Sequence, residues 1–538
     1  MKPALSKGMI VAPQPDAVEA GARLYMAGGN AVDAAIGCAF TQCVIDQMMC
    51  GIAGFGTAQL YLPGKGVHEV VNFLSRAPKS VKPDMWEDLL EYETRDGFGF
   101  VLKGRVNDLG YRSVAMPGSL KGFEDLHRRH GRLPWAAVIE PAIRAAEEGY
   151  RVTPKVFTDW TTREGMGRVE VIDRIRFTPA YADLFFGAGG EPHPIGTLVK
   201  NPDYGRTLRQ IAADGADSFY KGAIAEAIAA DMARNDGLLA KADLESYEVD
   251  RGEPIWGEYR GLRVSVTRPA SSGAMLVRML HTLEHFDLKA LGHNTPDYMR
   301  VLAEVMKRAS VVKDRSIGDP AFIEVPIPRI IDKRVAASEA DAIKKGERAN
   351  VERAVIKEAA DTTHIAALDA EGNAVTLTHS LGMQSGVITQ GLGFMYNGAM
   401  AMFDPRPGRP QSLAPGKQRM SSMAPAILFK EKDPYLVLGA PGGSNIPMGI
   451  LQVILNVVDF GMPIVEAVNA ARFSATSNVI DVSARIPRYA CEALGRAGYE
   501  TVHSVQSFTT ARVHAILIEN GKVSGAADPA GGGMALAV

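Results

Sequence analysis

Cysteine is scarce in this sequence, and its scarcity excludes one class of protein. The 538 residues include four cysteines: Cys38, Cys43, Cys50 and Cys491. So few thiols in so long a chain do not make a disulfide framework of the kind that holds small secreted domains together. Three of them lie in a predominantly apolar stretch, so we expect buried, reduced thiols. The eleven histidines show no spacing like HExxH, and we expect neither a metal site nor a cofactor.

An excess of either charge is also missing. Lysine and arginine number 59 against 61 acidic residues, and no block of five like charges occurs, so the sequence gives no electrostatic footprint for nucleic acid or an anionic membrane. No run approaches the ~18 apolar residues of a membrane span. The opening "MKPALSKGMIVAPQP" has no apolar core of the kind found in secretory signals. We therefore expect a soluble, cytoplasmic protein whose partners are small molecules or peptides.

The patterns that are present predict helices at the front of the chain. The length allows two to four domains, or one large two-layer unit with insertions. Residues 16–48 have apolar positions at helical spacing, interrupted by Gly28-Gly29-Asn30, and predict two packed helices. "GIAGFGTAQLYLP" and "VHEVVNFL" then predict strands. A long helical middle follows, with "SLKGFEDLHRRHG", "WAAVIEPAIRAAEEG" and "TPDYMRVLAEVMKRASVVKD" as its clearest members.

A charged segment separates this middle from a strand-rich end. Between Ile331 and Asp361, 14 of 31 residues are charged, against 22% for the chain, which is typical of a solvated helix or an exposed linker. After it, "THIAALDA", "EGN" and "AVTLTHS" predict strand, turn and strand, and "APAILFKEKDPYLVLGAP" predicts a second hairpin. "IPMGILQVILNVVDFGM" predicts an amphipathic helix that stops at Gly461.

Two threonines at the start of the first hairpin raise a question of chemistry. A threonine hydroxyl is a poor nucleophile until a base lies beside it, and an N-terminal threonine can use its own α-amine. Thr362 would become such a residue if the Asp361–Thr362 bond were cut by an N-to-O acyl shift. Thr pairs are also common at strand starts because their side chains are β-branched, so "TTH" alone is a weak signal that favours a structural role.

Two further motifs favour the catalytic interpretation. "LGAPGGSN" puts Gly442-Gly443 between a predicted strand and a predicted helix, where two successive backbone N–H groups can point at one spot. That is the layout of an oxyanion hole, although a Gly-Gly turn can be purely structural. "MSSMAP" contributes Ser421-Ser422, whose hydroxyls could bind a substrate carboxylate or merely cap the turn.

With these motifs in order, the sequence resembles the γ-glutamyltranspeptidase family of self-cleaving N-terminal-nucleophile hydrolases. The resemblance implies an α+β fold, a four-layer αββα sandwich, built by a large subunit (residues 1–361) and a small subunit (residues 362–538) cut from one precursor. It covers nearly the whole chain. The segments that carry it are "GMIVAPQPDAVEAGARLYMAGGNAVDAAIGCAF", "GIAGFG", "AMPGSLKGFEDLHRRHGRLPW", "TTHIAALDAEGNAVTLTHS", "FDPRPGRP", "SSMAP", "APGGS" and "GAADPAGGG".

The resemblance also implies roles for individual residues. Thr362 becomes the nucleophile and the new N-terminus after cleavage between Asp361 and Thr362. Ser380 falls where the family has a second threonine that hydrogen-bonds the nucleophile. Gly442-Gly443 falls on the oxyanion hole, and Ser421-Ser422 on the serines that bind the substrate carboxylate. The implied mechanism is attack on an amide carbonyl, an acyl-enzyme, and its release to water or an amine.

The glutamyl clamp of the family is altered here. The family's "DFRE" arginine holds the glutamyl α-carboxylate, but the matching residues are Asn72, Phe73, Leu74 and Ser75, so Leu74 stands in the arginine's place. Arg76 lies two residues on, on the same face of a strand but several ångströms away. A charge-assisted hydrogen bond contributes roughly 1.5–3 kcal/mol, so losing a bidentate arginine removes much of the recognition of an amino-acid head group.

The side that binds the α-ammonium group is altered too. Where γ-glutamyl enzymes have an acidic "NNxMDDF"-like run, this chain reads "MYNGAMAMF", without a carboxylate between Phe394 and Phe403. Gly382 stands where the family has a polar asparagine. We therefore expect a more apolar pocket. Its candidate wall residues, each of which could equally belong to the core, are Leu74, Met383, Met395, Met400 and Met402.

These features together give one leading hypothesis and two alternatives. The short "DPRPGRPQSLAPGKQRMSSM" leaves no room for a lid loop, which favours water as the acceptor. The leading hypothesis is a self-cleaving amidohydrolase that acts on a small non-γ-glutamyl amide, with a carboxylate read by Ser421, Ser422 and Arg76, similar to oxamate amidohydrolase-like or glutaryl-type cephalosporin acylase-like branches. The alternatives are a γ-glutamyl hydrolase or transferase with a rebuilt clamp and an unprocessed pseudoenzyme that only binds a ligand or partner. A homodimer of heterodimers is a further expectation.

Overall fold

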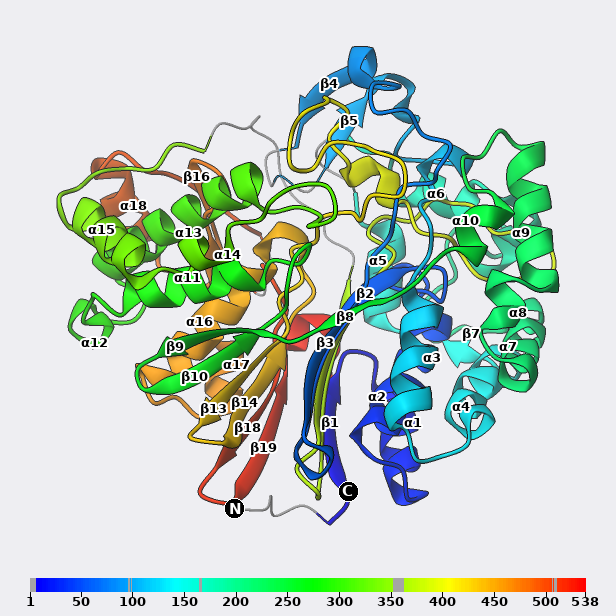
Figure 1. Ribbon diagram of the computed structural model, residues 1–538, viewed down its shortest axis with the longest axis horizontal. Coiled ribbons are helices and arrows are strands. Elements are labelled where there is room, and N and C mark those ends of the chain that lie inside the picture. Colours follow the sequence, from blue (N-terminus) through cyan, green and yellow to red (C-terminus); the bar gives the residue numbers. More distant parts are fainter. Residues whose placement is uncertain are drawn as a thin grey trace.

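Two antiparallel β-sheets packed face to face form the centre of the structure, a computed structural model (Figure 1). It describes residues 6–538 except 95–96, 98, 164–166, 352–361, 506 and 508–509. The first sheet has the order β20 (Met534–Ala537), β1 (Gly8–Ala12), β11 (Thr363–Asp369), β12 (Ala374–Ser380), β2 (Phe55–Leu62), β3 (Val67–Phe73) and β8 (Asp250–Gly252). The second has the order β19 (Lys522–Ala527), β18 (His514–Glu519), β14 (Asp433–Gly439), β13 (Ala426–Lys430), β10 (Leu262–Val266) and β9 (Ile255–Tyr259).

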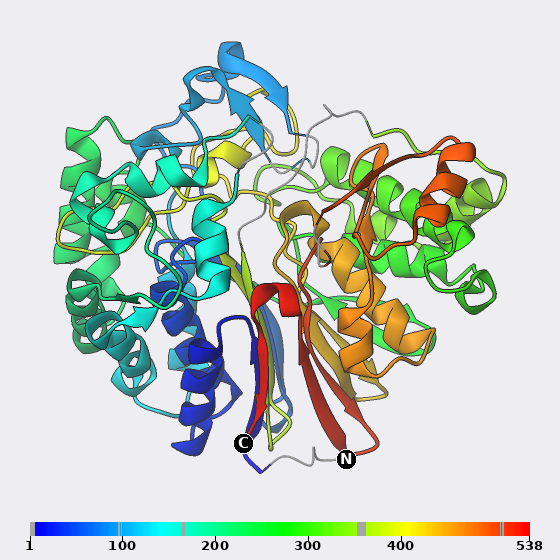
Figure 2. The same cartoon turned by 180° about the vertical axis from the view of Figure 1, so that it is seen from behind.

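Helices cover the outer face of each sheet, so the layers run helix, sheet, sheet, helix (Figures 1 and 2). The helices on the side of the first sheet include α1 (Pro15–Met26), α2 (Ala31–Ile45), α3 (Ser119–His130), α4 (Trp135–Glu148) and α7 (Pro202–Asp214). Those on the side of the second include α11 (Gly273–Leu283), α13 (Pro296–Ser316), α15 (Lys333–Lys344), α16 (Ile446–Val458) and α17 (Ile464–Asn469). The α+β expectation is confirmed.

Shorter elements complete the described part of the chain. The remaining helices are α5 (Pro154–Thr161), α6 (Val171–Arg176), α8 (Asp217–Tyr220), α9 (Ala223–Arg234), α10 (Lys241–Glu245), α12 (Leu288–Leu291), α14 (Ile327–Ile330) and α18 (Arg488–Arg496). Three small sheets consist of β4 (Leu90–Glu93) with β5 (Phe100–Leu102), β6 (Tyr150–Arg151) with β7 (Leu198–Val199), and β15 (Phe473–Ser474), β16 (Val479–Val482) and β17 (Glu500–His503). Within the described residues no helix has the length and apolar character needed to span a membrane.

Most of the elements expected from the sequence are present. Gly28-Gly29-Asn30 separates α1 from α2, and both predicted hairpins form, as β11–β12 and β13–β14. The turn of the first hairpin is local: Asp369 Oδ1 accepts hydrogen bonds from the backbone N–H groups of Glu371 and Asn373. The side chain thus fixes the turn, and with it the pairing of the two strands.

One expectation was wrong. The segment after Gly442-Gly443 was expected to be amphipathic, but every residue of α16 from Ile446 to Val457 is buried. The helix packs against α11, α17 and β14, so it has no solvated face as far as Val457. Its two polar side chains, Gln452 and Asn456, form hydrogen bonds inside the protein. It ends at Val458, before Gly461, whose φ is +65°.

The charged segment before Thr362 is described only in part. Its first third forms α15, which buries Ala336, Ala340 and Ile343 and leaves most of its other side chains accessible, as expected of a solvated helix. Residues 352–361, including Asp361, lie outside the described residues.

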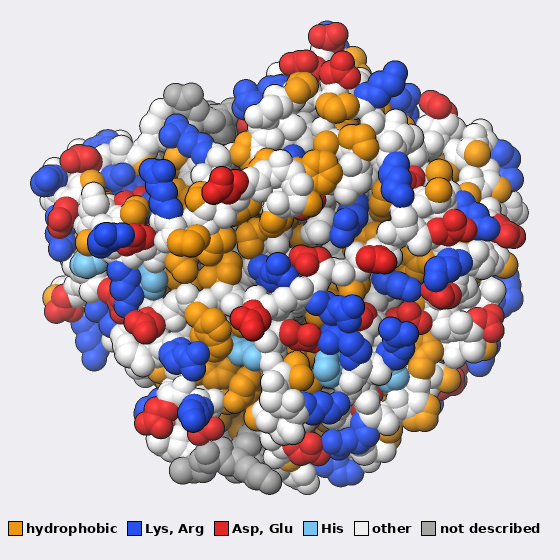
Figure 3. Space-filling view, viewed as in Figure 1, with side chains coloured by type: hydrophobic (Ala, Val, Ile, Leu, Met, Phe, Trp, Pro, Cys, Tyr) orange, Lys and Arg blue, Asp and Glu red, His pale blue; other side chains and the backbone are white. Residues whose placement is uncertain are grey.

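On the face seen in Figure 3, charges of both signs are interspersed around the central apolar side chains.

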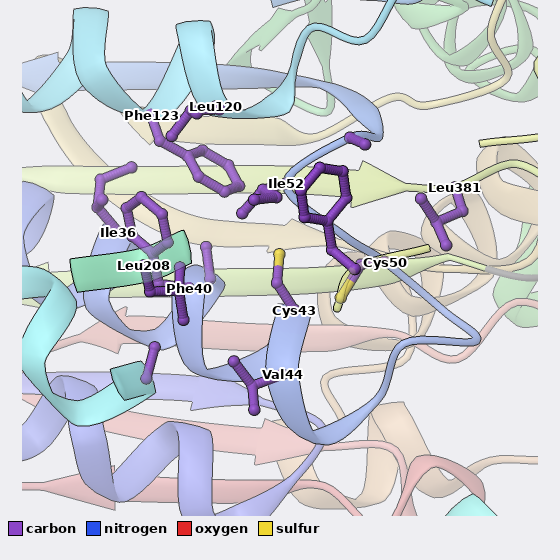
Figure 4. Close-up of a cluster of buried hydrophobic side chains, with 14 of the residues drawn as sticks. Ile36, Phe40, Cys43, Val44, Cys50, Ile52, Leu120, Phe123, Leu208 and Leu381 are labelled. Carbon is purple, nitrogen blue, oxygen red and sulfur yellow. The ribbon is translucent and has the colours of Figure 1, made fainter. Parts of the chain in front are cut away.

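The core beside the first sheet centres on α2, all of whose residues are buried. Figure 4 shows Phe40, Cys43 and Cys50 among the apolar side chains of this core. All four cysteines are buried free thiols, as predicted. Helix α2 also packs directly against β11, so its position fixes the strand that follows Thr362.

The N-terminus of α2 gives a prediction for stability. Asn30 Oδ1 accepts hydrogen bonds from the N–H groups of Val32 (2.9 Å) and Asp33 (3.1 Å), and Asp33 accepts one from the Asn30 N–H (2.9 Å). Asn30→Ala should lower the free energy of unfolding by about 1–2 kcal/mol, because the cap is lost. Asn30→Ser keeps a capping oxygen and should lose less. Urea-unfolding midpoints measure both, and equal midpoints for Asn30→Ala and wild type would contradict the assigned cap.

Candidate active site

Three neighbouring strands bring the predicted nucleophile and its partner to one end of the first sheet. In the β11–β12 ladder Thr363 pairs with His379, which places Thr362 opposite Ser380. In the next ladder Ser380 pairs with Phe55, the first residue of β2. Thr362, Ser380 and Phe55 therefore lie side by side across the sheet, because antiparallel register fixes which residues face each other.

The hydroxyl of Thr362 lies in hydrogen-bonding distance of Ser380. Thr362 Oγ1 donates to Ser380 Oγ at 3.2 Å, and the Gly382 N–H donates to the same oxygen at 2.7 Å. Thr362 is buried, with 4% of its surface exposed. Two donors on one oxygen hold Ser380 Oγ in place, so Gly382 positions the residue that orients the Thr362 hydroxyl.

The residue after Thr362 anchors the strand on its other face. Gln42 Nε2, from α2, donates to Thr363 Oγ1 at 3.0 Å, and Gln42 Oε1 lies 2.9 Å from His379 Nε2. Burial lowers the pKa of His379 to about 3, so the imidazole is neutral near pH 7. Because Thr363 and His379 lie on the helix side of the sheet, His379 cannot act as a base for Thr362. The contacts fix the start of β11 from behind.

Gly442 and Gly443 lie between β14 and α16, as the sequence predicts. Their φ values are +140° and +53°, and a Cβ on Gly442 would lie 2.6 Å from Ala511 Cα. Residues that carry a side chain rarely adopt such backbone angles, so both positions favour glycine. Gly443 begins a short 3₁₀ turn (Gly443–Asn445) that leads directly into α16. The N-terminal end of that helix, with its partial positive charge, faces the site and suits a developing oxyanion.

Ser421 and Ser422 approach from the second sheet. They precede β13, and Ser421 is held by its backbone: its N–H donates to Ala270 O at 2.9 Å, and its carbonyl accepts from Ser272 Oγ at 2.8 Å. Ser421 Oγ also accepts a hydrogen bond from the Met423 N–H at 3.2 Å. The segment is therefore fixed before any substrate arrives, which reduces the entropy lost on binding.

Apart from Gly382 and Gly442, the candidate site residues described above line one small pocket, whose empty space of about 200 Å³ includes solvent at its mouth. Four of the residues that line it were not selected from the sequence. Arg419 could have been selected because it lies two residues before the serine pair. Phe55, Met423 and Ile446 are apolar, and nothing in the sequence marks them as site residues. The lining residues are Phe55, Thr362, Ser380, Arg419, Ser421, Ser422, Met423, Gly443 and Ile446.

Other residues selected from the sequence lie outside this lining. Leu74 is fully buried in the core beside the second sheet. Arg76 is directed elsewhere: its guanidinium carbon lies 5.7 Å from the centre of the Tyr247 ring, and Nη2 donates to Glu248 O at 3.3 Å. The candidate wall methionines are buried in the two apolar cores, and none lines the described pocket: Met383, Met395, Met400 and Met402.

One cluster of potential metal ligands lies behind the sheet. The ligand atoms of Cys43, Cys50 and His379 lie within 4.8 Å of one another, and all three residues are buried. Burial raises the pKa of the Cys50 thiol well above its ordinary value, so that thiol is neutral, like the His379 imidazole. The Cys43 and Cys50 side chains pack within the apolar core beside the first sheet.

Comparison with known proteins decides the family. The model of the family described as gamma-glutamyltranspeptidase matches residues 17–538. The chain belongs to the γ-glutamyltranspeptidase family. The matched region includes every residue of the pocket. The family and the relatives identify the protein as a hydrolase.

The relatives differ in the activity that their names give. The chain is 38% identical to the acylase ACY 1 proenzyme of Pseudomonas sp. (strain SE83) over 509 residues, which cover 93% of this chain and 88% of that protein. It is 32% identical over 485 residues to the glutathione hydrolase proenzyme of Escherichia coli (strain K12), covering 87% and 80%. The crystal structure of a cephalosporin acylase from Bacillus halodurans superposes with a TM-score of 0.87 at 28% identity, covering 99% and 96%.

The geometry at Gly382 gives a testable consequence. Its φ is +75°, and a Cβ there would lie 2.5 Å from Met402 Cε and 3.0 Å from the Phe55 ring. Gly391 has a similar φ, +86°, with no atom within 4 Å of such a Cβ. Gly391→Ala should cost about 1–2 kcal/mol of stability from backbone strain. Gly382→Ala should cost a further 1–3 kcal/mol or so from overpacking.

Thermal or urea unfolding of the two variants compares these costs. Equal destabilisation would show that the crowding around Gly382 is relieved without cost, and would contradict the tight packing against Phe55.

Proposed function

We propose that the protein is a self-cleaving N-terminal-threonine amidohydrolase, acting through an acyl-enzyme on a small amide that is not a γ-glutamyl compound. The observation that carries the proposal is the shared pocket: the Thr362 hydroxyl, hydrogen-bonded to Ser380, and the Gly443 turn line the same small space. A nucleophile, a group that orients it and an oxyanion site are the parts that acyl transfer needs.

The first step makes the nucleophile an N-terminal residue. Thr362 Oγ attacks the carbonyl carbon of residue 361, the hydroxyl proton moves to the departing Thr362 nitrogen, and the peptide bond is replaced by an ester. Water then hydrolyses the ester, which leaves a carboxylate on Asp361 and a free hydroxyl and α-amine on Thr362. The products are residues 1–361 and 362–538. The word proenzyme in the names of the relatives supports such processing.

The second stage is the reaction with substrate. The α-amine of Thr362 accepts the proton from Oγ as Oγ attacks the amide carbonyl. Backbone N–H groups at Gly442-Gly443 and the positive end of α16 stabilise the tetrahedral oxyanion. The proton passes to the leaving amine, and the C–N bond breaks to leave an ester on Thr362. Water, activated by the same amine, releases the acid.

Two features support a substrate other than a γ-glutamyl compound. Leu74, which matches the clamp arginine of the family, is packed into the core and has no charge to offer a carboxylate. Residues 395–402, which match the acidic run of γ-glutamyl enzymes, have no carboxylate and are buried. An α-amino-acid head group therefore lacks the clamp arginine and the acidic run of the family, and of its partners there only the serine pair, Ser421-Ser422, is retained. Its recognition would require two compensating contacts elsewhere in the pocket.

Self-cleavage is tested on a denaturing gel. The 57.7 kDa chain should give two bands in a mass ratio of about two to one, with Thr362 at the N-terminus of the smaller. Thr362→Ala should remain one band, because it has no hydroxyl to attack the preceding carbonyl. Thr362→Ser keeps a hydroxyl and should cleave. A wild-type chain that stays intact in every preparation would contradict the proposal and favour a protein that only binds a ligand.

Substrate class is tested with a panel of p-nitroanilides. We expect hydrolysis of simple acyl anilides and little release from γ-glutamyl-p-nitroanilide, with rates at least tenfold apart, since one lost charge-assisted contact already changes binding by about that factor. Addition of glycylglycine as an acceptor should not raise the rate. Efficient γ-glutamyl turnover would instead assign the γ-glutamyl hydrolase or transferase activity, an alternative that the retained Ser421-Ser422 pair favours.

A further inference from the structure

The segment that lacks the clamp arginine has a second segment of backbone beside it. The Arg419 N–H donates to Ser75 O at 2.8 Å, and the Ala77 N–H donates to Lys417 O at 2.9 Å. Residues 417–419 therefore run alongside residues 75–77, directly after Leu74. Leu74, at the position of the clamp arginine, thus lies next in the chain to a segment that pairs with the one carrying Arg419.

The Arg419 side chain turns into the pocket rather than toward solvent. It lines the same space as Thr362 and Ser422, and only 4% of its surface is exposed. Its guanidinium carbon lies 5.0 Å from the centre of the ring of Phe55, another residue that lines the pocket, within range of a cation–π contact. Burial lowers the pKa of Arg419 to about 9, so it is still a cation near pH 7.

A buried cation in a small pocket selects anions strongly. Charge interactions strengthen as water is excluded, and a guanidinium offers a planar pair of donors that fits a carboxylate. Ser421 and Ser422 contribute two hydroxyls to the same pocket. Arg76, in contrast, directs its guanidinium to Tyr247 and Glu248.

We propose that Arg419 replaces the missing clamp and binds a carboxylate on the acyl part of the substrate, together with the Ser421-Ser422 pair. This inference rests on the proposed hydrolysis at Thr362. Because Arg419, the serine pair and Thr362 line one pocket, the carboxylate and the scissile carbonyl belong to the same acyl group. The substrate class is therefore an amide whose acyl part carries a free carboxylate and lacks the α-ammonium group of a γ-glutamyl compound. Arg419 is a specificity-determining residue, and Thr362 performs the chemistry.

The test compares matched acyl groups on the self-cleaved enzyme. The probes are succinyl- and glutaryl-p-nitroanilide and, for each, the neutral compound in which the free carboxylate is a carboxamide. Wild type should prefer the anionic member by about 10- to 100-fold in kcat/KM, the value of one charge-assisted contact. Arg419→Gln should reduce this ratio to near one, mainly by lowering kcat/KM for the anion. Arg419→Lys should restore part of the preference.

The matched control is Arg76→Gln, a neighbouring arginine with the same charge change. It should keep the anion preference of wild type. If Arg76→Gln removes the preference and Arg419→Gln does not, the inference is overturned in favour of Arg76. If wild type shows no preference for the anion, the inference is also overturned, although cleavage into two chains and hydrolysis of neutral anilides would leave the proposed function standing.

Two further outcomes separate folding from recognition. Each variant is first tested for self-cleavage, seen as two bands on a gel. Carboxylate recognition does not affect this measurement. If Arg419→Gln and Arg419→Lys both stay uncleaved, Arg419 serves folding or processing and the inference is wrong. If wild type itself stays uncleaved and releases no anilide, the proposed function has failed, and the inference that rests on it falls too.

Discussion

The pairing of β11 with β12 is the constraint on which the site depends. Thr363 pairs with His379, and only in that register does the Thr362 hydroxyl meet Ser380 Oγ, at 3.2 Å. A slip by one residue would turn Thr362 to the helix side of the sheet, where Gln42 now binds Thr363. The Asp369 turn at one end and the Gln42 contact at the other fix the register. The nucleophile is thus positioned by backbone pairing, before any ligand is present.

The loops of the second sheet supply the candidate oxyanion site and the serine pair of the same site. The Gly442-Gly443 turn follows β14, and the serine pair precedes β13, so both lie at the end of the sandwich where β11 starts. Face-to-face packing of two sheets brings these loops together because strand ends from both sheets meet at one edge. Rigid strands and a fully buried α16 then hold groups that must stay in place during acyl transfer.

Recognition and chemistry are separable in this pocket. In the proposed function, Thr362, Ser380 and Gly443 carry out the acyl transfer, and the side chains around them select the acid. The neighbouring positions differ from the γ-glutamyl pattern: Leu74 is apolar and buried, and Arg419 reaches the pocket from an adjacent segment. The relatives likewise have different activities in their names, an acylase and a glutathione hydrolase.

The sequence by itself determined the local elements and the catalytic motif. Periodicity and turn residues predicted α1, α2 and both hairpins, since these depend on contacts close in sequence. The order of motifs predicted Thr362, Ser380 and the glycine pair as the candidate catalytic residues, and the structure brings Thr362, Ser380 and Gly443 to one pocket. The burial of α16 required tertiary structure, because an apolar run fits a helix with one dry face as well as one enclosed on all sides. The same holds for the two arginines: which guanidinium enters the pocket depends on how residues 417–419 pair with residues 75–77, segments more than 300 positions apart in the chain.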